Sequence, residues 1–166
     1  MSRFNVVTKL KGFPPGLDSL YDQMLRYIDG SDDADLCRRI LATITVVYRP
    51  ITLKDLSSLV EELDGNDLEL LQEIVGRCGS LLTIQDGIIY FVHQSAKDFL
   101  LQKAFDVLFP SRNEEVHYAV FSRSLLAMSN ALRRDMYSLG TLGYPIEQVQ
   151  QQNPDPLAAL RYSCVY

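Results

Sequence analysis

The spacing of apolar residues predicts two amphipathic helices early in the chain. The first begins at Leu17 and ends at Gly30, and the second follows Ser31-Asp32-Asp33 and ends at Pro50, because proline cannot continue a helix. In each, apolar residues recur at intervals of three and four. They are Leu17, Leu20, Tyr21, Met24, Leu25 and Ile28 in the first helix, and Leu36, Cys37, Ile40, Leu41, Ile44 and Val47 in the second.

Two further helices are expected between residues 51 and 79. Ile51-Thr52 is a short extended segment, and Thr52 with Asp55 has the spacing of a capping box, in which both side chains satisfy N–H groups of the first turn. The turn at 64–67 supplies an N-cap for the next helix, and Gly79 suits the residue after its C-terminus. The expected buried positions are Leu53, Leu56, Leu59, Val60 and Leu63, then Leu68, Leu70, Leu71, Ile74, Val75 and Cys78.

A β-hairpin and a fifth helix follow, with a histidine at their junction. β-Branched and aromatic residues predict strands at 80–84 and 88–92 around a turn containing Gly87. His93 comes next, and Ser95 with Asp98 has the S-x-x-D spacing of a second capping box. A polar ring just before a helix N-terminus is well placed to contact an anion. It can equally be a buried histidine that ties two backbone segments together.

The order helix, extended segment, helix, helix, hairpin is that of a winged helix. We therefore predict a mainly α fold: a winged-helix domain at 31–104, made of helices and a two-stranded β-hairpin wing and flanked by further helices. Residues 1–30 are interpreted as a lead-in and the tail helix of a preceding helical domain.

The remainder of the chain is expected to add helices outside this domain. Within 105–140, an apolar loop or short helix at 105–110 would cover the wing, and a long helix begins at Asn113. Its apolar stripe is Val116, Val120, Phe121, Ser124, Leu125, Met128 and Leu132. Residues 141–166 are interpreted as a linker and the truncated start of a further helix, Leu157 to Tyr166 with Pro156 as its first residue. We accordingly expect a fragment or a truncated gene product.

Composition narrows the class of protein. The 166 residues carry a formal charge of −5, which disfavours unspecific binding to nucleic acid, and no apolar run approaches the ~18 residues of a membrane span. The three cysteines are far apart and odd in number, which indicates reduced thiols rather than disulfides or zinc. We therefore expect a cytoplasmic protein that binds no metal.

No recognised catalytic pattern is present. The chain lacks G-x-x-x-x-G-K-[ST], H-E-x-x-H, C-x-x-C and G-x-S-x-G, so neither a phosphate cradle nor a nucleophile elbow is present. Its two histidines are His93 and His117, and His117 falls at a helix start where a surface or core-rim position is expected. The sequence therefore predicts that the chain is not an enzyme.

Many winged helices place the helix before the wing in the major groove of DNA. Here that helix carries Asp67, Glu69 and Glu73 against Arg77 alone, and the wing tip carries Asp86. The phosphate backbone would repel such a surface. A DNA-binding regulator is therefore the less favoured hypothesis, and a module that packs against another protein domain is the more favoured one.

Four segments resemble a known family. They are Gly16-Leu17-Asp18-Ser19-Leu20-Tyr21, Arg38-Arg39-Ile40-Leu41-Ala42, Tyr48-Arg49-Pro50-Ile51-Thr52-Leu53 and Phe91-Val92-His93-Gln94-Ser95-Ala96-Lys97-Asp98-Phe99-Leu100. They are similar to the winged-helix region that follows the nucleotidase in fungal NACHT proteins. These are STAND-type NTPases, many of them vegetative-incompatibility-like proteins with C-terminal WD-type or ankyrin repeats.

The resemblance implies a role for His93. The family pattern is F-x-H-x-x-x-x-[DE]-[FY], which Phe91, His93, Asp98 and Phe99 match, and its histidine approaches the β-phosphate of bound ADP in the closed, inactive state. Ser95 lies within this strand–helix junction. The implied partners are a nucleotidase domain in cis and a following repeat or helical region. ADP or ATP is the implied ligand only of an intact NACHT protein, because this chain lacks the P-loop.

Two hypotheses follow from different classes of protein. The chain is a non-catalytic regulatory module that docks on a nucleotidase in cis and senses ADP through His93. Alternatively, it is a stand-alone interaction fragment, or a truncated gene product, without nucleotide sensing.

Overall fold

The structure, a computed structural model, describes residues 17–109, 113–150, 152–153 and 155–166. Its helices are α2 (Leu17–Asp29), α3 (Ala34–Val46), α4 (Leu53–Leu59), α5 (Leu68–Arg77), α6 (Gln94–Gln102), α7 (Phe105–Leu108) and α8 (Asn113–Ala131). Single 3-10 turns form η1 (Glu61–Leu63), η2 (Gly79–Leu81) and η3 (Ile146–Gln148), and the strands are β1 (Ile51–Thr52), β2 (Leu82–Gln85) and β3 (Ile88–Phe91). The predicted lead-in at 1–13 lies outside the described residues.

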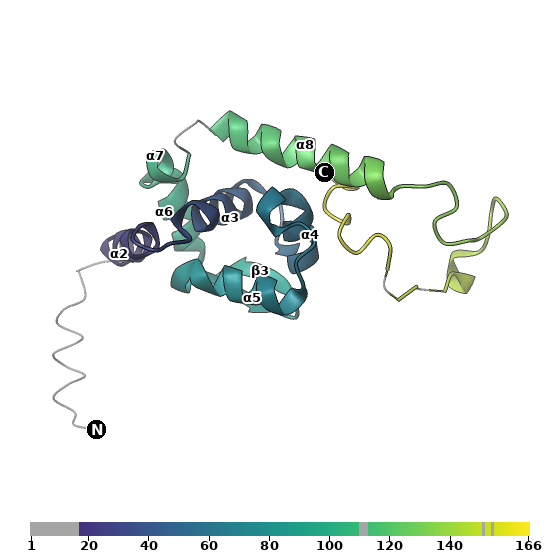
Figure 1. Cartoon of the computed structure of the whole chain (residues 1–166), viewed down its shortest axis with the longest axis horizontal. Coiled ribbons are helices and arrows are strands. Elements are labelled where there is room, and N and C mark those ends of the chain that lie inside the picture. The colour runs from purple at the N-terminus through teal and green to yellow at the C-terminus, as the bar shows by residue number, and fades with distance from the viewer. Residues whose placement is uncertain (1–16, 110–112, 151, 154) are drawn as a thin grey trace, which may run out of the picture.

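The order of α3, α4, α5, hairpin and α6 confirms the predicted winged helix (Figure 1). The predicted two-stranded hairpin wing is confirmed as β2 and β3, and β1 adds a third strand beside β3, so that the antiparallel sheet has the order β1-β3-β2. Ile51 lies opposite Ile89 and Thr52 opposite Ile88. Pairing with β1 satisfies backbone groups on the second edge of β3, which a bare hairpin would leave to water.

Side-chain caps set the starts of two helices as expected. At α4, the Asp55 N–H donates to Thr52 Oγ1 at 3.1 Å and the Thr52 N–H donates to Asp55 Oδ2 at 3.1 Å, which completes the capping box. At α5, Asp67 Oδ1 accepts the Leu70 N–H at 2.8 Å. Gly79, with φ of +76°, follows the end of α5 in the left-handed conformation that glycine tolerates best.

The core lies between the helices and the inner face of the sheet. Ile40 and Leu41 of α3 are fully buried, as are Ile51 and Ile89 of the sheet and Leu100 of α6. Each such side chain contributes about 1.5–3 kcal/mol on leaving water. The apolar stripes that predicted the helices therefore converge on one cluster, which fixes the helices against the sheet.

The cysteines are free thiols, with Cys37 and Cys78 buried and Cys164 exposed. Hydrogen bonding to Cys37, together with burial, raises the pKa of the Cys78 thiol. Cys78 therefore stays protonated and behaves as a small core residue.

α7 and α8 extend the domain beyond the winged helix. α7 packs mainly against α3 and α6, so the prediction that this segment covers the wing is wrong. α8 lies across α3 and α4 along one edge of the molecule in Figure 1. No helix in the described ranges is long and apolar enough to cross a bilayer.

The expected last helix, Leu157 to Tyr166, is wrong. Residues 156–165 form consecutive turns instead, and this segment returns to α4. There the Tyr162 N–H donates to Oδ1 of the fully buried Asp55 at 3.1 Å, and Ser58 Oγ donates to the Ala159 carbonyl at 2.9 Å. These long-range bonds to α4 replace part of the backbone pattern that a regular helix would need. We call residues 155–166 the C-terminal strap.

Candidate functional site

The candidate site is the junction where the chain leaves the sheet. Phe91 is the last residue of β3 and pairs with Leu82, and the Val92 N–H donates to the Leu81 carbonyl at 3.0 Å. His93 has extended backbone angles, with φ of −147° and ψ of 144°, and is the N-cap of α6. Hydrogen bonding on both sides of the junction therefore fixes the position of the His93 backbone.

The imidazole ring of His93 is exposed and oriented through Nδ1. Nδ1 lies 3.2 Å from the Ser95 nitrogen and 2.7 Å from Ser95 Oγ. Because the Ser95 N–H donates to Nδ1, this atom carries a lone pair, and the proton of the neutral ring resides on Nε2. Nε2–H has no hydrogen-bond partner in the described part of the chain and can donate to an incoming acceptor.

A second residue, on α2, supports this arrangement. The Tyr21 hydroxyl lies 2.7 Å from Ser95 Oγ, and the Tyr21 ring lies 5.6 Å from the Phe99 ring, centroid to centroid. Both rings are buried. The pattern of apolar residues placed Tyr21 in the core but gave no signal that its hydroxyl reaches a residue 74 positions away.

The predicted supporting residues therefore do not all have their predicted roles. Phe91 is half-buried against the core, and Phe99 is buried. The capping box expected at Ser95 and Asp98 is wrong, because His93 is the N-cap and the exposed Asp98 accepts from Gln94 Nε2 at 3.1 Å. The alternative of a buried histidine is also wrong, since the ring is exposed. The sheet ends at Phe91, so the cap position falls two residues earlier than the S-x-x-D spacing indicated.

A basic groove of about 200 Å³ lies beside this junction. Its walls come from the segment between α3 and β1, from β3 and from α6, and they include Arg49, Gln94 and Lys97 but no acidic side chain. The Arg49 guanidinium also lies over the ring of Tyr162 in the C-terminal strap, 5.9 Å from its centroid. The groove is suited to anions rather than cations.

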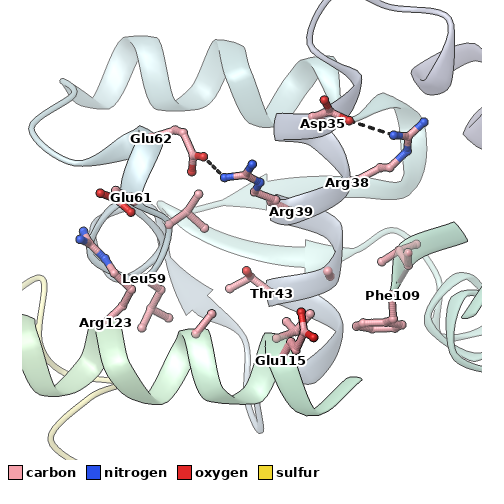
Figure 2. A pocket seen from close by; sticks show the side chains of 15 residues that line it. Asp35, Arg38, Arg39, Thr43, Leu59, Glu61, Glu62, Phe109, Glu115 and Arg123 are labelled. Carbon is pink, nitrogen blue, oxygen red and sulfur yellow. Dashed lines mark hydrogen bonds and ion pairs between the residues drawn. The ribbon is translucent and has the colours of Figure 1, made fainter. Parts of the chain in front are cut away.

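A larger cavity of about 540 Å³ lies between α3, α4, η1, α7 and α8 (Figure 2). Its arginines are all neutralised by carboxylates: Arg39 pairs with Glu62, Arg38 with Asp35 and Asp29, and Arg123 with Asp64. His93 does not line it. The cavity is therefore less suited to an anion than the groove beside His93.

Known proteins match the chain over this same domain. The family model described as the winged-helix domain of GPI inositol-deacylase matches residues 21–112, more than half of the chain. The chain belongs to this winged-helix family. The match begins at Tyr21 and includes the whole junction, from the supporting hydroxyl on α2 to the end of α6.

A curated relative is similar over nearly the entire chain. It is the vegetative incompatibility protein HET-E-1 of Podospora anserina, which is 50% identical over 176 aligned positions that cover 98% of this chain. The chain spans 13% of that relative's length. No solved structure matches the chain.

Proposed function

We propose that this chain is the regulatory winged-helix module of a NACHT-type nucleotide-dependent switch. The module docks in cis on a nucleotidase domain, and His93 senses the phosphates of bound ADP. Family membership and the similarity to a vegetative incompatibility protein support a regulatory role. The module itself is non-catalytic, and a following repeat or helical region and a cytoplasmic location belong to the same proposal.

The observation that carries the sensing role is the orientation of the His93 ring. Its Nδ1 is occupied by Ser95, so the exposed Nε2–H is the donor available to a phosphate oxygen. Hydrogen bonds to charged acceptors are stronger than those between neutral groups. The basic groove adds Arg49 and Lys97 next to the junction, and both favour an anion.

A phosphate contact of this kind can operate a switch. A ligand shifts a conformational equilibrium only by its difference in affinity for the two states. If His93 touches ADP only in the docked state, ADP stabilises docking, and exchange of ADP allows the module to move away. The module thereby reports which nucleotide is bound without taking part in hydrolysis.

The test is His93→Ala in the intact protein that contains this chain behind its nucleotidase. Loss of one hydrogen bond to a charged group costs about 1.5–3 kcal/mol, so we expect ADP to dissociate at least about tenfold faster. His117→Ala is the matched control, because His117 is exposed on α8, away from the junction. Unchanged ADP release in His93→Ala would leave the ring with a capping role only.

A further inference from the structure

α8 is apolar on two faces, and only one of them is covered. Val116, Val120 and Ser124 lie on the face that packs against α3 and α4. The other face, which we call the outer stripe, is Tyr118, Phe121, Leu125 and Leu132, exposed by 71, 58, 47 and 45%. In Figure 1, α8 lies at the edge of the molecule, and no described element lies on its far side.

The outer stripe has the spacing of a helix–helix seam. Its residues, with the half-buried Met128, follow one another at steps of three, four, three and four, which is the a/d repeat of paired helices. The residues on its flank, Ser122 and Ser129, are small and uncharged, so another helix can approach closely. Leu126 is exposed by 48% but falls outside this repeat.

The two ends of α8 carry charges of opposite sign. Glu114 and Glu115 open the helix, and Arg133 and Arg134 follow its last turn. All four are exposed, and none forms an ion pair within the described ranges. A second α8 laid antiparallel brings the acidic start of each helix to the basic end of the other, whereas a parallel copy places like charges together.

We infer that the outer stripe is the docking surface for a second copy of this chain, in an antiparallel, two-fold symmetric pair. Such an interface is self-complementary, since each copy presents the same stripe and the same charged ends. The exposed parts of these side chains amount to roughly 400–500 Å² per copy, against about 800 Å² in a standard interface. The pair is therefore weak and reversible, with a dissociation constant on the order of 100 μM.

Sedimentation equilibrium of the whole chain from about 10 μM to 1 mM tests the pair. We expect reversible dimerisation, and Leu125→Glu should raise the dissociation constant at least about tenfold, because it places a charge at the centre of the seam. Leu126→Glu is the matched control on the same helix and should change the dissociation constant by no more than about twofold. Far-UV circular dichroism confirms that both variants remain folded.

A charge reversal tests the direction of pairing. Glu114→Arg with Glu115→Arg should weaken the dimer several-fold, and adding Arg133→Glu with Arg134→Glu should restore it. A parallel pair would not be weakened by the first reversal, since it already places like charges together. A chain that stays monomeric to 1 mM, or a dimer that Leu125→Glu and Leu126→Glu weaken equally, would overturn the inference.

Discussion

The capping box of α4 also holds the C-terminal strap, which makes Asp55→Ala an informative perturbation. Asp55 is fully buried, and its carboxylate accepts three hydrogen bonds. Oδ2 accepts the Thr52 N–H at 3.1 Å and the Thr52 Oγ1–H at 2.9 Å, and Oδ1 accepts the Tyr162 N–H at 3.1 Å. The substitution removes the acceptor of all three donors at once.

The expected loss follows from these contacts. Losing the capping-box bonds from Thr52 to the Asp55 carboxylate costs about 1 kcal/mol, and leaving the buried Tyr162 N–H without its acceptor costs about 2 kcal/mol more. Asp55→Ala should therefore lower the free energy of unfolding by about 3 kcal/mol. Asp67→Ala is the matched control, because Asp67 is an exposed N-cap with a single bond to Leu70, so its loss should cost only about 1 kcal/mol.

Urea unfolding followed by far-UV circular dichroism measures the free energy of unfolding of both variants. A truncation separates the capping-box contribution of Asp55 from the contribution of its bond to Tyr162. In a chain that ends at residue 154, the Tyr162 donor is gone, so Asp55→Ala should lower the free energy of unfolding only by about 1 kcal/mol, the contribution of its capping-box bonds to Thr52. Equal losses in the full and truncated chains would show that Asp55 does not hold the C-terminal strap against α4.

Three further predictions concern the backbone, acid stability and the junction. Gly79→Ala should lower the free energy of unfolding by about 1 kcal/mol, because φ is +76° at this residue. Gly76→Ala should raise it by about 0.5–1 kcal/mol, because Gly76 lies inside α5 with open space where the Cβ would be. Thermal unfolding of the two variants measures both changes. The Arg161 guanidinium lowers the pKa of the Asp155 carboxyl, so its stabilising contribution is present above its ordinary value of 3.8 and is lost as the pH falls through the lower folded value. Asp155→Asn should therefore flatten the acid limb of the curve of unfolding free energy against pH, and an unchanged limb would refute the role of this carboxylate. Ser95→Ala removes the hydroxyl that bonds to Tyr21 between α2 and α6, and should lower the free energy of unfolding in urea by about 1 kcal/mol. An unchanged free energy of unfolding would mean that water replaces the bond between Tyr21 and Ser95.

Apolar spacing, turn residues and capping patterns in the sequence predicted the elements of the winged helix. The N-cap of α6 shows what such local patterns do not predict. Thr52 and Asp55 form the capping box that their spacing indicated, since β1 ends at Thr52 and α4 begins at the next residue, Leu53. Ser95 and Asp98 have an equivalent spacing, yet the ladder of β3 ends at Phe91 and α6 begins at Gln94. Strand pairing, which spacing does not reveal, decided which residue became the cap.

Long-range contacts explain the other differences. The stripe of α8 was predicted as one face, but packing on α3 and α4 covers Val120 and Ser124 and leaves Phe121 and Leu125 exposed. Residues 156–165 have the composition of a helix and form turns because they bond to α4. The same difference between local and long-range signals applies to the candidate site. The residues around His93 form a pattern that the sequence shows, whereas the hydrogen bond of the Tyr21 hydroxyl to Ser95 joins residues far apart in the chain and could not be predicted.

The proposed contact between the exposed Nε2–H of His93 and a phosphate of bound ADP can be observed in a structure of the intact protein in its ADP-bound state. We expect Nε2 to lie about 2.7–3.2 Å from a phosphate oxygen while Nδ1 keeps its hydrogen bonds to Ser95. A structure in which ADP is bound by the nucleotidase and the His93 ring faces solvent or another protein surface would contradict it.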